Sequence, residues 1–247
     1  SGARRPRRKR RAFPWRRWGP RAGDALVAVL AALGVVAAAS APLGIRSVEV
    51  EGARHTTPRD AVAASHLLGA SPFRASGASS RAGLVAALPA VRDATIELLL
   101  PDRARVRLAE REPLGRWIAG GAEFFVDHDG VLFASADPAA APEIRVYDDS
   151  VALRRGGERI DSALVDAALR LARIAPGELR ADAAAPQVHL GPVGLVLRSG
   201  AGWEVRFGGP ERFDEKLRLA RRFLQDNPVR RIDYLDVRTA DRIVISP

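Results

Sequence analysis

The sequence predicts an α+β protein with a membrane-spanning helix near its N-terminus, and three features of the 247-residue chain support this prediction. A cluster of cations precedes an uncharged apolar run over residues 25–43. A strand–helix–helix–strand–strand pattern occupies residues 45–112, and strand patterns with two amphipathic helices occupy residues 113–247. We therefore expect a basic cytoplasmic tail over residues 1–23, a transmembrane helix over residues 24–44 and two folded domains after it.

The positive charge of the chain is concentrated in its N-terminal tail. Ten of the 39 lysines and arginines lie between Arg4 and Arg21, and the other 29 balance the 29 acidic residues. A protein that binds nucleic acid needs its positive excess on the folded part, so we expect no nucleic-acid partner. Cations beside an apolar run instead keep that end of the chain in the cytoplasm. The predicted topology determinants are Arg7, Arg8, Lys9, Arg10 and Arg11.

The uncharged run has nearly the roughly 20 residues that span a hydrocarbon core. Its expected anchoring residues are Ala25, Leu26, Leu30, Leu33 and Val36. Two alternatives remain open: a buried helix of a soluble protein, and a signal peptide cleaved at the A-x-A-like Ala39–Ala41. The cations would have no purpose beside a buried helix, and the run exceeds the roughly 7–15 apolar residues of a signal peptide. Either an anchor or a signal peptide places the rest of the chain outside the cytoplasm.

The first folded segment reads as a compact arrangement of three strands and two helices. Thr57 is a predicted helix N-cap, Pro58 takes the first helical position, and Gly69 stops this helix. No glycine-rich loop follows the first strand, which excludes a nucleotide-binding α/β fold. The expected elements are strands over residues 45–52, 94–100 and 103–110 and helices over residues 58–68 and 80–88.

Strand patterns dominate the second folded segment. Asp161 is predicted to cap an amphipathic helix that ends at Pro176, and a second such helix is expected over residues 213–225. The last two strands form a predicted hairpin whose outer strand has no following segment to cover it. The expected strands cover residues 114–119, 123–126, 130–134, 143–147, 187–190, 194–197, 203–207, 231–238 and 243–246.

Several segments together resemble the bacterial cell-division family FtsQ, also called DivIB. Their order and spacing cover nearly the whole chain, which makes the resemblance fairly specific. The resemblance implies that residues 45–112 form a POTRA domain and that residues 113–247 form a C-terminal β domain. The segments include VEVEG (Val48–Gly52), EREPLGRW (Glu110–Trp117), FFVDHDGVLF (Phe124–Phe133), GWEVRFGG (Gly202–Gly209) and IDYLDVRTADRIVI (Ile232–Ile245).

The resemblance also implies a function, that of a non-catalytic scaffold of the division machinery. Such a scaffold links early and late division proteins at the inner membrane, with its exported domains in the periplasm, and it binds the FtsB/FtsL pair. A free edge strand in the C-terminal domain is suited to accept a strand from that partner. The candidate contact residues are Tyr234, Asp236, Arg238, Ile243, Val244 and Ile245 on the terminal hairpin, and Lys216 and Arg222 on the last helix.

Lys216, Arg218, Arg221 and Arg222 are expected to form a basic face on that helix. A partner with acidic groups is one interpretation of this face. The alternative is a solvated face that binds nothing.

No residue pattern predicts catalysis. The chain lacks cysteine, a P-loop and a G-x-S-x-G motif. Asp127, His128 and Asp129 offer metal or acid–base chemistry, but Asp129–Gly130 is a hairpin turn signal and no distant ligands join them, so we interpret them as a polar hairpin tip. We therefore expect no enzyme activity, cofactor, metal or small-molecule substrate. An exported peptidoglycan-associated enzyme and a POTRA-containing transport component remain the alternative functions.

Overall fold

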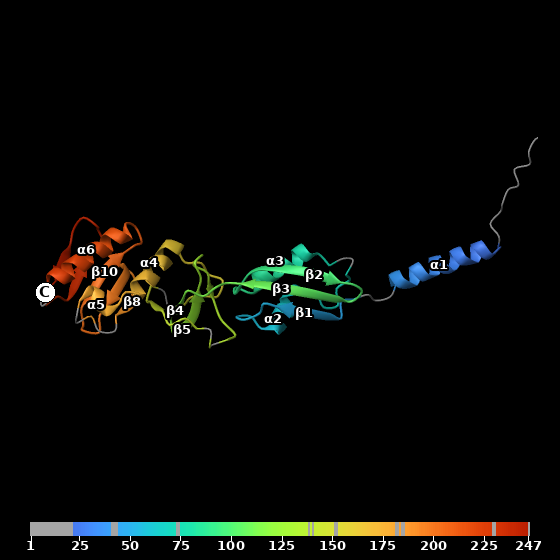
Figure 1. Ribbon diagram of the computed structural model, residues 1–247, viewed down its shortest axis with the longest axis horizontal. Coiled ribbons are helices and arrows are strands. Elements are labelled where there is room, and N and C mark those ends of the chain that lie inside the picture. The colour runs from blue at the N-terminus through green and yellow to red at the C-terminus, as the bar shows by residue number, and fades with distance from the viewer. Residues whose placement is uncertain are drawn as a thin grey trace, which may run out of the picture. The chain divides into compact units, whose positions relative to one another are not determined.

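The fold is described from a computed structural model (Figure 1). The chain divides into two compact units, residues 1–43 and residues 44–247. The predicted topology determinants Arg7 to Arg11 lie outside the residues that the structure describes. The described residues are 22–40, 44–72, 75–137, 139, 141–150, 153–180, 183, 186–228 and 231–246.

The first unit contains helix α1 (Ala22–Ser40), with Asp24 in its first turn. Across the part of the chain that the structure describes, no helix is both long enough and apolar enough to cross a membrane. The transmembrane helix expected over residues 24–44 is therefore not found there, and α1 begins before residue 24. Of the expected anchoring residues, Ala25, Leu26, Leu30 and Leu33 are exposed on α1, and the side chain of Val36 is outside the described set.

The second unit opens with a three-stranded sheet and two helices, in the predicted order. β3 lies in the middle of the sheet, parallel to β1 and antiparallel to β2. One face of the sheet buries Ala104, Val106 and Leu108 against Ala61 of α2 and Leu84 of α3. We refer to residues 44–112 as the N-terminal module. Its elements are β1 (Ser47–Glu51), α2 (Pro58–Ser65), α3 (Gly77–Ala87), β2 (Val91–Leu99) and β3 (Arg103–Glu110).

Capping side chains decide where α2 and α3 begin. The Thr57 hydroxyl accepts the backbone N–H of Asp60 at 3.1 Å, which confirms the predicted cap. Ser76 caps α3 in the same way, so this helix begins before residue 80. α2 ends before residue 68 because His66 adopts the left-handed conformation, with φ of 52°.

The other face of the three-stranded sheet carries a network of ion pairs. Arg105 contacts Glu49 and Glu51, both at 3.1 Å, and Glu97 at 3.7 Å. Arg107 contacts the same Glu51 at 2.9 Å and Glu97 at 3.4 Å. These charges lie on all three strands and neutralise one another, so this face is polar rather than a second apolar surface.

The rest of the second unit contains a nine-stranded mixed sheet. Its strand order is β12-β11-β10-β9-β8-β7-β4-β5-β6. The pairs β4–β7, β7–β8 and β10–β11 are parallel, and the others are antiparallel. The strands are β4 (Gly115–Ala119), β5 (Ala122–Val126), β6 (Leu132–Phe133), β7 (Arg145–Asp148), β8 (Gln187–Gly191), β9 (Gly194–Arg198), β10 (Glu204–Gly208), β11 (Tyr234–Asp236) and β12 (Val244–Ser246).

Helices α4 (Ser162–Ala172) and α6 (Phe213–Asp226) pack on this sheet as the amphipathic patterns predict. α4 contacts β7 and β8, and α6 contacts β10 (Figure 1). Asp161 caps α4, because its carboxylate accepts the N–H groups of Ala163 and Leu164. A further short helix, α5 (Pro176–Leu179), begins where the sequence predicts only the end of α4.

β11 is shorter than the strand predicted over residues 231–238. Arg238 donates its backbone N–H to the Asp236 carboxylate at 3.0 Å. This local side-chain bond takes the place of a ladder bond and turns the chain out of the strand.

Glu110 and Arg111, at the C-terminal end of β3, bind backbone groups of other segments of the N-terminal module. The Glu110 carboxylate accepts three successive backbone N–H groups, from Arg54, His55 and Thr56, at 2.7–2.9 Å. Arg111 donates to the carbonyl of Pro89 at 3.0 Å. The boundary expected between residues 112 and 113 remains a prediction.

Arg111 also forms an ion pair with Asp127 at 2.7 Å, and the two side chains are only 11% and 1% exposed. A small apolar cluster lies in the same region and includes Ala90, Phe125 and Phe133. The His55 ring meets both phenylalanine rings edge-on at 5.9 and 5.6 Å. This region therefore combines a buried ion pair with aromatic packing.

Candidate protein-interaction site

The edge of β12 is the candidate interaction site. β12 pairs antiparallel with β11, with Leu235 opposite Ile245 and Asp236 opposite Val244. Among the described residues no strand pairs with its other side, since β12 is the last strand in the sheet order. Backbone donors and acceptors on such an edge are available to a strand from another chain. The terminal hairpin predicted from the sequence is thus confirmed, although both of its strands are shorter than expected.

The opposite end of the same sheet is closed by the chain itself. Leu132 of β6 donates its N–H to the carbonyl of Glu158 at 2.9 Å and accepts the N–H of Gly157 at 2.7 Å. Val131 bridges to Arg159 in the same segment. β6 therefore offers little free backbone, in contrast to β12.

The side chains of β12 point alternately toward the core and the solvent. Ile243 and Ile245 are partly buried against the core, whereas Val244 is 41% exposed and pairs with Asp236. The guanidinium carbon of Arg206 lies over the ring of Tyr234, 3.9 Å from the ring centre. The structure thus brings the predicted hairpin residues together and leaves Val244 the most accessible apolar side chain among them.

Asp236 and Arg238 form a local pair that fixes the end of β11. The Arg238 Nε donates to the Asp236 carboxylate at 2.9 Å. Burial alone would raise the pKa of Asp236, but the hydrogen bonds from Arg238 outweigh it and hold that pKa below its usual value. Arg238 is therefore held by its own strand end, although its side chain remains 49% exposed.

Arg212 connects α6 to the turn between β11 and β12. Its two terminal nitrogens donate to the Asp241 carboxylate at 3.0 and 2.9 Å, and it also contacts Glu215 at 2.7 Å. No local sequence pattern predicts this contact, because Arg212 and Asp241 lie far apart in the chain. The contact fixes the hairpin turn relative to the helix.

The expected exposure of Lys216 is wrong. Lys216 is 3% exposed, and its ammonium group donates to the carbonyl of Gly209 at 3.0 Å. Desolvation by burial lowers its pKa. Helical spacing contains a signal for this burial, since Lys216 lies three residues after Phe213 and four before Ala220, both of which are buried. Arg222, by contrast, is 85% exposed and has one long contact, to Asp226 at 3.7 Å.

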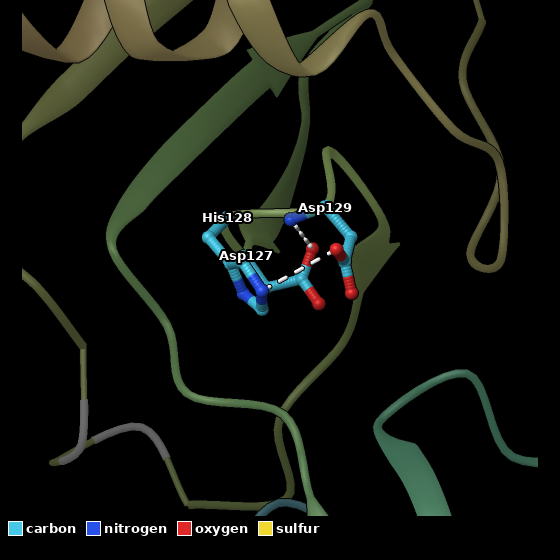
Figure 2. A group of neighbouring side chains, drawn as sticks. All are labelled: Asp127, His128 and Asp129. Atoms are coloured by element: carbon cyan, nitrogen blue, oxygen red, sulfur yellow. Dashed lines mark hydrogen bonds and ion pairs between the residues drawn. The ribbon is translucent and has the colours of Figure 1, made fainter.

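Asp127, His128 and Asp129 lie together at the β5–β6 hairpin, with possible ligand atoms within 4.8 Å of one another (Figure 2). One Asp127 oxygen accepts the N–H groups of Asp129 and Val131 at 3.0 and 2.8 Å, and the other binds Arg111. Both oxygens of this carboxylate are thus engaged, and a guanidinium beside them disfavours a cation. The arrangement gives Asp127 a structural role at the turn.

The comparison with known proteins agrees with this architecture. Residues 43–111 match the family described as POTRA domain, FtsQ-type. The chain is 32% identical over 195 residues to the cell division protein FtsQ of Chloroflexus aurantiacus, covering 78% of this chain and 70% of the relative. It is 30% identical over 200 residues to FtsQ of Chloroflexus aggregans, covering 81% and 72%. A shorter similarity, 29% over 106 residues, covers 43% of this chain and 35% of FtsQ from Caulobacter vibrioides.

The fold and the domain match define the class, a protein that carries a POTRA domain of the FtsQ type. The similarity to the two Chloroflexus proteins extends beyond that domain into the nine-stranded sheet. The chain belongs to the FtsQ family of cell division proteins.

Proposed function

We propose that this protein is a non-catalytic scaffold of the bacterial division machinery. It links early and late division proteins, and it binds an FtsB/FtsL-like pair by adding a partner strand to β12. The observation that carries the proposal is the edge position of β12, the last strand in the sheet order. Backbone groups supply much of the affinity in such strand addition, and side chains of the hairpin set the register.

Proline in place of Val244 should weaken binding of the purified FtsB/FtsL pair by about tenfold or more. The N–H of Val237 donates to Arg206 of β10, so the amide of Asp236 faces β12, and Val244, opposite Asp236, directs its own N–H toward β11. Proline at Val244 removes that ladder donor and loosens β12 from the sheet, which removes the edge that the partner strand would join. Alanine at the same position keeps the backbone groups, so Val244→Ala should have a milder effect. A titration of the full chain with the purified pair measures both affinities.

Control measurements for this titration distinguish binding at the β12 edge from binding at the basic face of α6. Val244→Ala should unfold at nearly the same denaturant concentration as wild type, since Val244 is largely outside the core, whereas Val244→Pro should show a lower midpoint because it removes a bond of the β11–β12 ladder. If deletion of residues 241–247 leaves the affinity unchanged, strand addition is wrong. A loss of affinity in Arg222→Gln alone would then move the contact to α6.

We also propose that the N-terminal region attaches the protein to the bacterial inner membrane, with the tail in the cytoplasm and residues 44–247 in the periplasm. The support is the sequence pattern, ten cations followed by the uncharged run over residues 25–43.

A reporter that is active only outside the cytoplasm should be active when fused after Pro247 and inactive when fused before Asp24. The positive-inside rule gives this orientation. The reverse activity pattern would contradict it. A mature protein that lacks its first 41 residues would instead support the signal-peptide alternative.

A further inference from the structure

The N-terminal module begins at a pole built from three segments, residues 44–46, 67–70 and 99–103, which we name the N-terminal pole. The N–H of Gly69 donates to the carbonyl of Ile45 at 2.8 Å, and the N–H of Arg46 donates to the carbonyl of Asp102 at 2.7 Å. A side-chain carbon added at Gly44 would lie 3.0 Å from the Gly69 carbonyl oxygen. The turn after α2 and the β2–β3 turn therefore flank the point where the chain enters the module.

Two exposed leucines lie on these two turns. Leu68 is 59% exposed and Leu100 is 64% exposed. Among the described residues of the module, they are the exposed large apolar side chains. One exposed leucine needs no explanation, but both lie at the same end of the module, which indicates an apolar contact there.

The cations at the pole are less neutralised than those further along the sheet. The side chain of Arg46 is 78% exposed, and among the described residues the one carboxylate that it reaches is that of Asp102, at 3.9 Å. Arg103 is exposed, and among the described residues it has no carboxylate partner. Arg105 and Arg107, on the same face of β3, are each paired with glutamates. Positive charge thus remains available beside the two leucines.

We infer that the N-terminal pole lies against an anionic lipid bilayer, with Leu68 and Leu100 among the lipids and Arg46 and Arg103 on the phosphates. The inference rests on the membrane attachment proposed above. Gly44 directly follows the apolar run over residues 25–43, so the pole is the part of the module joined to that run by the shortest length of chain. Apolar tips beside cations are the combination that binds an anionic membrane surface.

The absence of cysteine from the sequence permits a clean test with single labels. The variants Leu68→Cys and Leu100→Cys would each carry an environment-sensitive fluorophore in the full chain, reconstituted into vesicles of phosphatidylglycerol and phosphatidylcholine. Leu153→Cys is the matched control, since Leu153 is 77% exposed and lies outside the module. We expect blue-shifted emission at positions 68 and 100 and several-fold stronger quenching by a lipid-borne quencher than at position 153.

The outcomes separate this inference from the proposed attachment. A chain that floats with the vesicles while both module labels remain in water overturns the inference and leaves the attachment intact. A chain that does not float overturns both. Blue-shifted emission without lipid quenching means that a protein covers the pole, and also overturns the inference. Combining Arg46→Gln with Arg103→Gln should reduce the quenching in anionic vesicles, and unchanged quenching would refute the role given to the arginines.

Discussion

Methionine in place of Arg111 should lower the free energy of unfolding by about 3 kcal/mol, because it leaves the buried carboxylate of Asp127 without its cation. Asp127 is 1% exposed, and the Arg111 contact is 2.7 Å long. Methionine keeps much of the side-chain volume, so the loss reports the ion pair together with the hydrogen bond from Arg111 to the Pro89 carbonyl. Urea unfolding of the full chain measures the change, provided that wild type and variant have similar slopes.

A double-mutant cycle tests whether the pair is the cause. Asp127→Asn alone should also destabilise the chain, and the double variant should lose clearly less than the sum of the two single losses. Arg107→Met is the matched control, because Arg107 is 51% exposed and its ion pairs are accessible to water. If Arg107→Met costs as much as Arg111→Met, burial of the pair is not what makes it important.

Alanine in place of Gly130 should destabilise the protein by at least about 3 kcal/mol, since two costs add. Gly130 has φ of 76°, which L side chains rarely adopt, and an added carbon would lie 2.0 Å from the carbonyl oxygen of Ile160. The N–H of Ile160 in turn donates to the carbonyl of Gly130 at 2.8 Å. The close approach is therefore part of the pairing between the hairpin and the segment before α4.

Gly121 provides the matched control for this substitution. Its φ is 81°, but an added carbon would have nothing within 4 Å. Gly121→Ala should therefore cost only about 1 kcal/mol, the conformational part of the penalty. Equal unfolding midpoints for the two variants would mean that the Ile160 backbone moves aside, and would contradict the steric argument.

Local signals predicted much of this fold. Thr57 and Asp161 accept the backbone bonds expected of N-caps, and the alternation around Val106 identified the buried face of β3. The end of a helix is harder to predict from the sequence when it depends on a single residue in the left-handed conformation. The sequence around His66 does not predict that α2 ends there: histidine adopts the left-handed conformation more often than most residues, but too rarely to mark the end of a helix.

The candidate site was predictable in outline and less so in its contacts. The terminal hairpin follows from strand patterns and a turn, and the side chains of Ile243 and Val244 take the alternation that those patterns imply. The helical spacing of Lys216 from Phe213 and Ala220 indicates its burial, but the fixed hairpin turn depends on Asp241 reaching Arg212. Arg212 and Asp241 come together only after the sheet has formed, so no local pattern contains this contact.

The closed end at β6 has a consequence for stoichiometry. A sheet with two open ends can propagate, because each added copy presents a new end to the next and the product is a filament. Here the chain occupies one end with its own residues 157–159, and among the described residues β12 is the end strand left without a second neighbour. Under the strand addition proposed above, one incoming strand saturates that end, which favours a complex with one partner per protein and disfavours open-ended growth through this sheet.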